Sequence, residues 1–219
     1  MKKIILVAVA LVFGGATFAQ TSSTTGTKSR FGLKGGVNLP KYKYVNDNNN
    51  TSNETETSTN FHLTGYADAP IGGVFSIQPG ISLQGKGAKY FDNGTNQVED
   101  NVLAIEIPVN LLANLAAGPG KLFIGGGPYA GFNVAGERKF ISNSSPSADR
   151  KLNIGDNGGD DLKAIDFGIN LLAGYQLSTG LNFSAGYGLG LTNLYPTSTS
   201  TTNVEQNNRV LSFSVGFAF

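Results

Sequence analysis

The stretch VLSFSVGFAF at residues 210–219 decides the fold of this chain, because its side chains alternate strictly between two kinds. Successive side chains of a β-strand point to opposite faces, so every second residue shares a face. One face is strongly apolar here, and the other is small or polar. The apolar face consists of Leu211, Phe213, Val215, Phe217 and Phe219, and the opposite face of Ser212, Ser214, Gly216 and Ala218. This pattern predicts a β-strand with two chemically different faces.

The same stretch resembles the closing strand of bacterial outer-membrane β-barrel proteins, which alternates in this way and ends in Phe. The resemblance implies a C-terminal signal that the barrel-assembly machinery recognises during insertion. The residues of this signal are Phe213, Val215, Phe217 and Phe219. A strand of a water-soluble sandwich could show the same alternation, so the choice between the two classes depends on the other segments of the chain.

The other end of the chain has the pattern of a secretory signal peptide. Lys2 and Lys3 precede an apolar run at residues 4–13, and small residues follow up to Ala19. A basic start, a short apolar core and small residues before the cleavage point are typical of such a peptide. The apolar run is shorter than the about 20 residues that a spanning helix needs. We therefore predict a signal peptide over residues 1–19, export by the Sec pathway, and a short periplasmic segment over residues 20–30.

Composition excludes several classes of function. Cleavage would remove two of the 16 basic residues, which leaves 14 against 15 acidic ones and a formal charge of −1. A nearly balanced charge gives no basic surface for nucleic acid. The sequence has no cysteine, so it offers neither a disulfide framework nor a thiolate metal site. We expect no nucleic-acid partner, no resident metal and no cofactor.

Eight segments carry the alternation, each about as long as a tilted strand that crosses a bilayer, which takes about ten residues. The segments are residues 31–39, 61–69, 74–86, 102–114, 122–134, 164–177, 181–191 and 210–219. The fifth is the least regular, because Phe123 and Tyr129 share a face with three glycines. An even number of strands is typical of single-chain bacterial barrels. The sequence therefore predicts an all-β domain over residues 31–219, an eight-stranded, antiparallel, up-and-down transmembrane β-barrel.

The connections between these segments alternate between short and long, which supports the same topology. The short ones contain turn residues and lie at residues 70–73, 116–121 and 178–180. The long ones are polar and lie at residues 40–60, 91–101, 135–162 and 195–208. Outer-membrane barrels have short periplasmic turns and long extracellular loops. All four long loops are therefore expected outside the cell, and the first has too little apolar content to order itself.

A water-soluble eight-stranded barrel of the lipocalin type is the alternative architecture. Such a barrel is apolar inside, whereas the polar face here carries Lys34, Asp68, Glu106 and Asp166. With the apolar face turned inward, most of the large residues would crowd a lumen that holds only a modest number of side chains. The membrane barrel is therefore favoured, with its polar face turned to the lumen.

Six segments resemble, in order, those of the PorT-like family of outer-membrane β-barrels from Bacteroidetes. Each segment alone is weakly specific, but together they span nearly the whole predicted barrel. The resemblance implies the barrel fold and a location in the cell outer membrane, and one branch of the family is linked to secretion and gliding. The segments are FGLKGGVNL (31–39), FSIQPGISLQGKGAKY (75–90), EIPVNLL (106–112), GGGPYAGF (125–132), IDFGINLLAGYQL (165–177) and YGLGLTNL (187–194).

The polar face predicts a cluster of charged side chains inside the barrel. Its members are Lys34, Asp68, Glu106 and Asp166. Charges inside a barrel are tolerated when they pair or meet water. Because an eight-stranded barrel leaves no aqueous channel, we interpret them as a structural cluster, with Lys34 paired to Glu106 or Asp166. A proton path, an ion path or a catalytic cluster is the functional alternative.

An enzymatic role has less support, because no catalytic motif is present. His62 is the only histidine, and Asp68 lies six residues further along the same strand, about 20 Å away at about 3.3 Å per residue. These two residues are therefore not expected to form a catalytic dyad. Residues 156–161, DNGGDD, have the composition of a calcium loop but lack the ligand spacing of an EF-hand. We predict a solvated loop there.

Aromatic residues gather near the predicted outer ends of the strands. They are Tyr42, Tyr44, Tyr90, Phe91, Phe140 and Tyr195. We interpret them as the aromatic girdle of a membrane interface.

The predicted function is that of an integral outer-membrane protein with a structural or surface-interaction role, which displays four polar extracellular loops. The first alternative is an accessory component of transport or protein secretion across the outer membrane, and the second is a lipid-modifying enzyme. The expected partners are outer-membrane lipids, the barrel-assembly machinery during insertion, and an extracellular or envelope protein.

Overall fold

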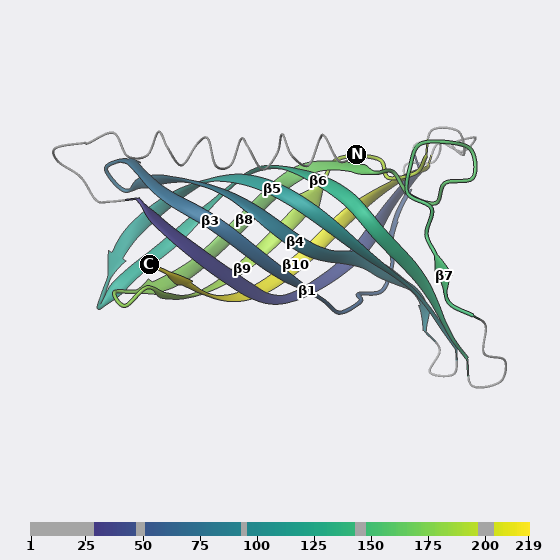
Figure 1. Cartoon of the computed structure of the whole chain (residues 1–219), viewed down its shortest axis with the longest axis horizontal. Coiled ribbons are helices and arrows are strands. Elements are labelled where there is room, and N and C mark those ends of the chain that lie inside the picture. The colour runs from purple at the N-terminus through teal and green to yellow at the C-terminus, as the bar shows by residue number, and fades with distance from the viewer. Residues whose placement is uncertain (1–28, 47–50, 93–95, 143–147, 197–203) are drawn as a thin grey trace.

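The chain folds into one closed ring of β-strands (Figure 1). This computed structural model describes residues 29–46, 51–92, 96–142, 148–196 and 204–219. The strands are β1 (Arg30–Asn46), β2 (Thr51–Glu54), β3 (Asn60–Gly72), β4 (Phe75–Asp92), β5 (Asn96–Ala117), β6 (Gly120–Ser142), β7 (Arg150–Lys151), β8 (Ile165–Leu177), β9 (Leu181–Gly190) and β10 (Val204–Ala218). Two short strands, β2 and β7, add to β1 and β6, and the other eight form the ring. No helix among the described residues is long and apolar enough to cross a membrane.

The ring closes between the first strand and the last. β1 pairs with β10 from Gly32 with Ala218 to Asn46 with Val204. All neighbours in the ring are antiparallel, in the order β1-β3-β4-β5-β6-β8-β9-β10. Closure pairs the two strands that would otherwise be sheet edges. The predicted eight-stranded, antiparallel, up-and-down barrel is confirmed.

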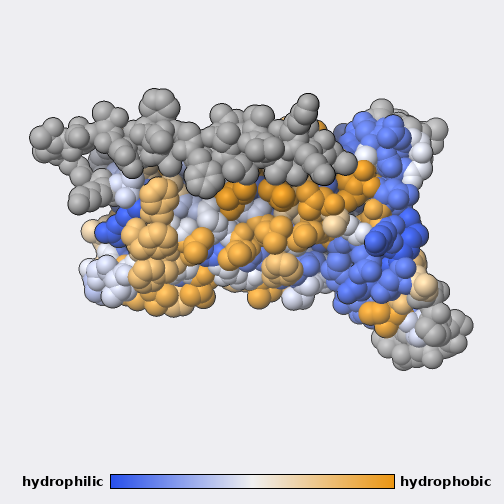
Figure 2. Space-filling view, in the orientation of Figure 1, coloured by the Kyte–Doolittle hydropathy of each residue, from blue (hydrophilic) through white to orange (hydrophobic). Residues whose placement is uncertain are grey.

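The outer wall of the barrel is apolar, and the inner wall is mostly polar. Along β10, Phe213, Val215 and Phe217 are about half exposed, whereas Ser214 and Gly216 between them are buried. The same alternation on the neighbouring strands gives a band of exposed aliphatic and aromatic side chains, one side of which Figure 2 shows. A continuous apolar band around a barrel is typical of a lipid-facing surface. The predicted orientation of the two faces is confirmed.

The two ends of the barrel differ in their connections. Tight turns join β3 to β4, β5 to β6 and β8 to β9 at the end where β10 finishes, and the longer connections lie at the other end (Figure 1). Two of the turns place Gly73 and Gly118 at φ values of 56° and 55°, which a residue without a Cβ adopts at little cost. Short turns mark the periplasmic end of outer-membrane barrels, and long connections mark the extracellular end.

Three neighbouring strands are much longer than predicted. β4, β5 and β6 contain 18, 22 and 23 residues, although about ten are enough to cross a bilayer. Their ladders continue through most of the stretch 91–101 and into the stretch that follows residue 135, so the loops predicted there are wrong in their bounds. Opposite charges face each other in this extension, as in the pair Glu99 and Lys139, and such cross-strand pairs stabilise a sheet without apolar alternation.

The first extracellular connection is also ordered in its described part, against expectation. β2 pairs antiparallel with the outer end of β1. Beyond β2, the backbone N–H groups of Thr55 and Ser58 donate to the carbonyls of Tyr42 and Pro40, each over 3.0 Å. Backbone pairing requires no apolar side chain, which is why a polar composition did not prevent order here.

A small apolar cluster covers the extracellular mouth of the barrel. Leucines from the connections after β7 and after β9 pack there against side chains of β1, β4 and β5. The members are Tyr42, Ala88, Val102, Leu152, Leu162 and Leu194. We call this cluster the cap core.

The tyrosines near the outer mouth pack around the cap core. Tyr44 and Tyr90 contact it, and the ring centroids of Tyr44 and Tyr195 lie 6.1 Å apart. Tyr42 itself is only 1% exposed. The interface girdle expected from the sequence is therefore wrong for these tyrosines, because they face the extracellular loops and not the lipid.

The ring of strands extends from Arg30, where β1 begins, to Ala218, where β10 ends, and the predicted domain range of 31–219 stays a prediction. The predicted signal peptide at residues 1–19 lies outside the described residues, as does most of the segment at residues 20–30. Both stay predictions.

Candidate functional site

One lysine stands at the centre of the charged groups in the lumen. Lys86 on β4 places its Nζ 3.0 Å from Glu106 Oε2 on β5 and 2.9 Å from Asp166 Oδ2 on β8. The three side chains are at most 4% exposed. The ammonium also lies over the ring of Tyr129 on β6, 4.5 Å from its centroid. We call these four residues the Lys86 cluster.

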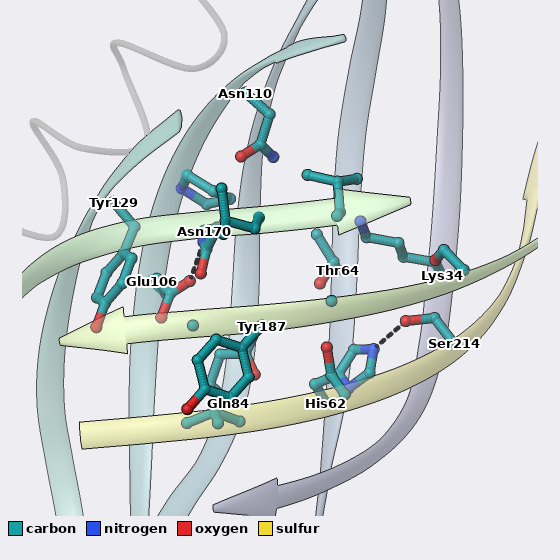
Figure 3. Close-up of a pocket in the computed structure, with 18 of the residues that line it drawn as sticks. Lys34, His62, Thr64, Gln84, Glu106, Asn110, Tyr129, Asn170, Tyr187 and Ser214 are labelled. Atoms are coloured by element: carbon teal, nitrogen blue, oxygen red, sulfur yellow. Dashed lines mark hydrogen bonds between the residues drawn. The ribbon is translucent and has the colours of Figure 1, made fainter. Parts of the chain in front are cut away.

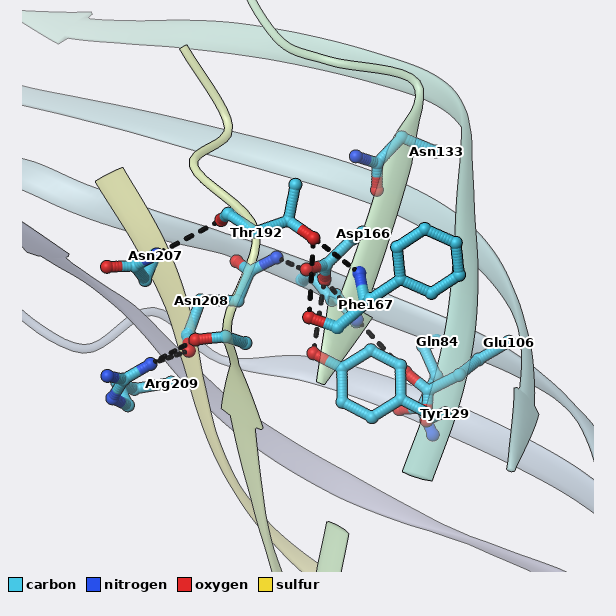
Figure 4. A network of polar contacts seen from close by, with 12 residues as sticks. Gln84, Glu106, Tyr129, Asn133, Asp166, Phe167, Thr192, Asn207, Asn208 and Arg209 are labelled. Atoms are coloured by element: carbon cyan, nitrogen blue, oxygen red, sulfur yellow. Dashed lines mark hydrogen bonds and ion pairs between the residues drawn. The ribbon is translucent and has the colours of Figure 1, made fainter. Parts of the chain in front are cut away.

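Neutral donors also hydrogen-bond to the two carboxylates (Figure 4). Asn170 Nδ2 donates to Glu106 Oε1 over 3.0 Å. The Tyr129 hydroxyl donates to Asp166 Oδ2 over 3.2 Å, and Asn208 Nδ2 donates to the same oxygen over 2.8 Å. Buried charges are stable only when partners and hydrogen bonds compensate their loss of water. The Lys86 cluster and its donors therefore tie five strands together across the lumen.

The predicted pairing of Lys34 with Glu106 or Asp166 is wrong, because Lys86 occupies that place. None of the ion pairs among the described residues includes Lys34. Its Nζ lies 5.6 Å from the centroid of the Tyr66 ring. Alternation along a strand assigns a side chain to a face, but the register between strands decides which side chains meet.

Asp68 belongs to a separate pair. Its Oδ2 lies 3.2 Å from the Nζ of Lys121, which follows the turn between β5 and β6. Sequence reasoning missed both Lys86 and Lys121 as lumen cations. Lys86 shares the polar face of Ser82 and Gln84, so the alternation of its segment already placed it on the lumen side. Lys121 lies in a predicted turn, where no alternation applied.

His62 hydrogen-bonds at both ring nitrogens inside the lumen. Its Nδ1 lies 2.8 Å from Asn38 Oδ1 on β1, and its Nε2 lies 2.8 Å from Ser214 Oγ on β10. His62 is 5% exposed and Ser214 is 9% exposed. The partners of the histidine thus come from other strands, and Asp68 is not one of them. The sequence had no signal for this contact, since Ser214 lies 152 residues away.

The lumen contains a polar cavity of about 70 Å³ that Lys34, His62, Glu106 and Ser214 help to line (Figure 3). A cavity needs about 10–15 Å³ to hold one water, so several waters fit here. A second cavity of about 10 Å³ lies beside it, and Lys34 and Ser184 line both. Three residues of the Lys86 cluster, Lys86, Glu106 and Tyr129, line the larger cavity themselves.

The acidic stretch at residues 156–161 is held by neighbouring protein groups. The Arg150 guanidinium donates to both carboxylate oxygens of Asp161, each over 2.8 Å, and the N–H of Asn153 donates to Oδ2 over 2.9 Å. The hydrogen bonds from Arg150 lower the pKa of Asp161 below its usual value. No group of three or more His, Cys, Asp or Glu side chains in the described part of the chain is arranged to hold a metal.

The residues of the predicted assembly signal lie in the lipid-facing wall. Phe213, Val215, Phe217 and Phe219 are between 47% and 68% exposed. Their recognition by the assembly machinery stays a prediction.

Comparison with protein-family profiles supports the same architecture. The sequence profile of the family described as outer membrane protein beta-barrel domain matches residues 18–195. No curated protein matches the chain. Similar solved structures include the attachment invasion locus protein Ail of Yersinia pestis, with 11% identity and a TM-score of 0.43 over 88% of this chain and 100% of that one.

Two further solved structures have similar values. Neisserial surface protein A has 12% identity and a TM-score of 0.43, with 88% of this chain and 100% of that one covered. The outer membrane protease OmpT of Escherichia coli has 12% identity and a TM-score of 0.44, with 92% and 100% covered.

The closed ring of strands, the apolar outer wall and the match of the family profile over most of the chain point to one conclusion. The protein resides in the outer membrane. It belongs to the outer membrane β-barrel domain family.

Proposed function

We propose that this protein is a closed outer-membrane barrel that contacts other molecules at the cell surface. The extension of β4, β5 and β6 beyond the apolar band carries the proposal. The two longest strands have 22 and 23 residues, about twelve more than a crossing needs, which is roughly 40 Å at about 3.3 Å per residue. A ladder of this length presents an ordered surface well outside the membrane.

The protruding surface is polar and held in place. Figure 2 shows hydrophilic side chains gathered at the end of the barrel where β7 lies. Within the sheet, Arg138 donates two hydrogen bonds, of 2.6 and 2.8 Å, to the carboxylate of Asp100. A bidentate pair fixes both side chains in one geometry. A surface ordered in advance loses less entropy when a partner binds, which favours a binding role.

The filled lumen gives no support to the transport alternative. The Lys86 cluster crosses the lumen, and the cap core covers the outer mouth. An eight-stranded barrel is only wide enough for side chains or one small ligand. We therefore place the contact with other molecules at the extracellular surface and propose no transport path along the barrel axis.

Single-channel recording in planar bilayers tests the closed barrel. The purified, folded protein is expected to give no steady conductance steps, because paired side chains fill the lumen. Steady steps of uniform size from protein that shows a heat-dependent shift in gel mobility would contradict the proposal and favour transport.

Site-directed photo-crosslinking in intact cells tests the surface contact. A photoreactive amino acid at Glu137, an exposed position of the β6 extension, is expected to form adducts with an extracellular or envelope partner. The matched position is Ser178, in the turn at the other end of the barrel, where the same partner is not expected. The same adducts at both positions, or none at Glu137, would refute a surface contact by this sheet.

Within the family, we infer that the chain belongs to the PorT-like branch from Bacteroidetes. The support is the order of the six segments that resemble that branch, which cover most of the barrel strands. Outer-membrane lipids and, during insertion, the barrel-assembly machinery are the partners that this placement implies.

A further inference from the structure

The amide of Asn38 has a defined orientation in the lumen. Its Nδ2 donates to the backbone carbonyl of Gly85 over 2.9 Å and to Gln84 Oε1 over 2.7 Å. A backbone carbonyl can only accept, so the NH₂ end of the amide must face it. The carbonyl end, Oδ1, therefore points to His62.

This orientation decides which nitrogen of His62 carries the proton. Asn38 Oδ1 is an acceptor, so the Nδ1 atom that faces it must be protonated. In a neutral imidazole the other nitrogen, Nε2, then has a free lone pair. The lone pair faces Ser214 Oγ over 2.8 Å, so the serine hydroxyl donates to the ring.

We propose that Ser214, His62 and Asn38 form a nucleophile relay inside the barrel, with Ser214 as the nucleophile and His62 as its general base. The same arrangement activates serine for acyl transfer on unrelated folds. There, an acceptor orients a histidine, and the histidine accepts a hydrogen bond from the serine hydroxyl. Asn38 is a positioning residue in this relay. This relay lies in the lumen and does not depend on the proposed surface contact.

The cavity beside the relay sets the class of substrate. Its volume of about 70 Å³ and its polar lining suit a compact carboxylic ester such as an acetyl ester. Ser214 lies on a strand that is paired on both sides, with β1 and with β9. The backbone N–H groups of such a strand donate to the neighbouring strands, so they do not form an oxyanion hole. The positive charge for a developing oxyanion must then come from a side chain, and the ammonium of Lys34 lines the same cavity (Figure 3).

The reaction balances with the groups present and one water. Ser214 Oγ forms a bond to the acyl carbon while its proton passes to His62 Nε2. The bond from the acyl carbon to the alcohol oxygen then breaks, and the alcohol leaves with that proton. In the second half, water transfers a proton to Nε2 and attacks the acyl carbon, which releases the carboxylic acid and returns the proton to Ser214.

The substrate is expected to enter from the periplasmic side. The second cavity, of about 10 Å³, is lined by Asp68 and Lys121, which lie toward the short turns, and it shares the lining residues Lys34 and Ser184 with the first. Because a space of this size holds at most one water, lining side chains on this side must move when a substrate enters. On the extracellular side, the Lys86 cluster and the cap core cover the lumen.

Covalent labelling of the folded barrel tests the relay directly. The full-length protein in detergent micelles is treated with methanesulfonyl fluoride, a compact electrophile that serine attacks with loss of fluoride. In folded protein, peptide mass spectrometry is expected to locate one adduct, at Ser214. In protein unfolded in urea, Ser214 is expected to carry no adduct. An absence of label in folded protein, or equal label in both states, would overturn the proposal.

Variants separate a reactive serine from a merely packed one. His62→Gln keeps a polar side chain but removes the base, and it is expected to slow labelling by about 10²–10⁴-fold, the usual contribution of a general base. Asn38→Leu should slow labelling as well. Asn38→Asp keeps an acceptor for Nδ1 but loses the donor to the Gly85 carbonyl, so it should restore labelling in part. If both Asn38 variants label at the wild-type rate, the positioning role is wrong.

Ser76→Ala is the matched control. Ser76 is a buried serine on β4 that lines neither of the two cavities, so it takes no part in the relay or in substrate binding. This variant is expected to label at the wild-type rate, and Ser214→Ala is expected to abolish the label. Retention of the label in folded Ser214→Ala would refute the assignment of the nucleophile.

Discussion

At the scale of single residues, burial decides how much each charge in the lumen contributes. Lys86 holds two carboxylates at 2.9 and 3.0 Å in a site where all three groups are nearly inaccessible to solvent. In such a site the loss of hydration is large, so each charge depends on its partners. Lys34, which is in none of the ion pairs among the described residues, lies over the face of the Tyr66 ring at 5.6 Å, a weaker interaction.

We predict that Lys86→Met destabilises the barrel strongly. The change leaves Glu106 and Asp166 buried without their cation, which costs about 3–5 kcal/mol when one partner of a buried pair is removed. Urea unfolding in lipid vesicles measures the difference. The double variant with Asp166→Asn should recover part of the loss, because one uncompensated charge is gone. If that double variant is as unstable as Lys86→Met, the charge explanation is wrong.

Lys34→Met is predicted to destabilise the barrel less than Lys86→Met does. The sequence had instead suggested Lys34 as the central cation of the lumen. It removes a cation–π contact with Tyr66, worth about 0.5–2 kcal/mol. The same unfolding experiment measures it. A loss equal to that of Lys86→Met would contradict the assignment of Lys86 as the central cation.

At the scale of elements, closure of the ring depends on close approach between β1 and β10. A Cβ at Gly36 would lie 1.8 Å from the carbonyl oxygen of Phe213 on β10. A branched side chain there would push the two strands apart. The absence of a side chain at Gly36 is therefore a condition for the last pairing to form.

We predict that Gly36→Val prevents closure of the barrel. The measurable result is loss of the heat-dependent shift in gel mobility and resistance to protease in vesicles. Gly65→Ala is the control, since a Cβ there meets only the Leu33 side chain at 3.5 Å, an ordinary contact. A folded, protease-resistant Gly36→Val protein would mean that the two strands can separate locally without loss of closure.

The extracellular connection after β7 is predicted to lose its carboxylate contact in acid. The pKa of Asp161 is lowered by hydrogen bonds from Arg150, so the contact contributes fully above the usual aspartate pKa. It is lost only as pH falls through the lower, folded value. The amide shift of Asn153, which donates to Asp161, should titrate with a midpoint below 3.8. Arg150→Gln should move the midpoint upward, and an unchanged midpoint would mean that Arg150 does not lower this pKa.

At the scale of the whole molecule, the difference between the two ends predicts its orientation. The tight turns lie at one end and the cap core at the other, and the outer-membrane arrangement places the cap core outside. The sequence has no cysteine, so a single introduced thiol reports its own location.

A membrane-impermeant maleimide is predicted to label Gly158→Cys in intact cells. Gly158 is exposed in the extracellular connection between β7 and β8. Ser178→Cys, exposed in the turn between β8 and β9, should be labelled only after the outer membrane is opened. The opposite pattern would invert the orientation.

Much of the barrel was predictable because its cause is local. Alternation assigns each side chain to the lipid or the lumen from its own segment, and short turn-rich stretches mark one end. The strand count, the antiparallel order and the closing pair β1–β10 followed from these two patterns. The lengths of β5 and β6 did not, because cross-strand charge pairs such as Glu99 with Lys139 leave no alternation to detect.

The sequence by itself determined which face of each strand meets lipid, and thus that Glu106, Asp166, His62 and Ser214 point inward. Only the tertiary structure decided their partners. The partners depend on the register between strands that are far apart in the chain. A register shift by one residue would turn every side chain of a strand to the other face. A shift by two residues would keep the faces but change every contact. For this reason Lys86 took the place expected for Lys34, and Ser214 met His62 across 152 positions of sequence.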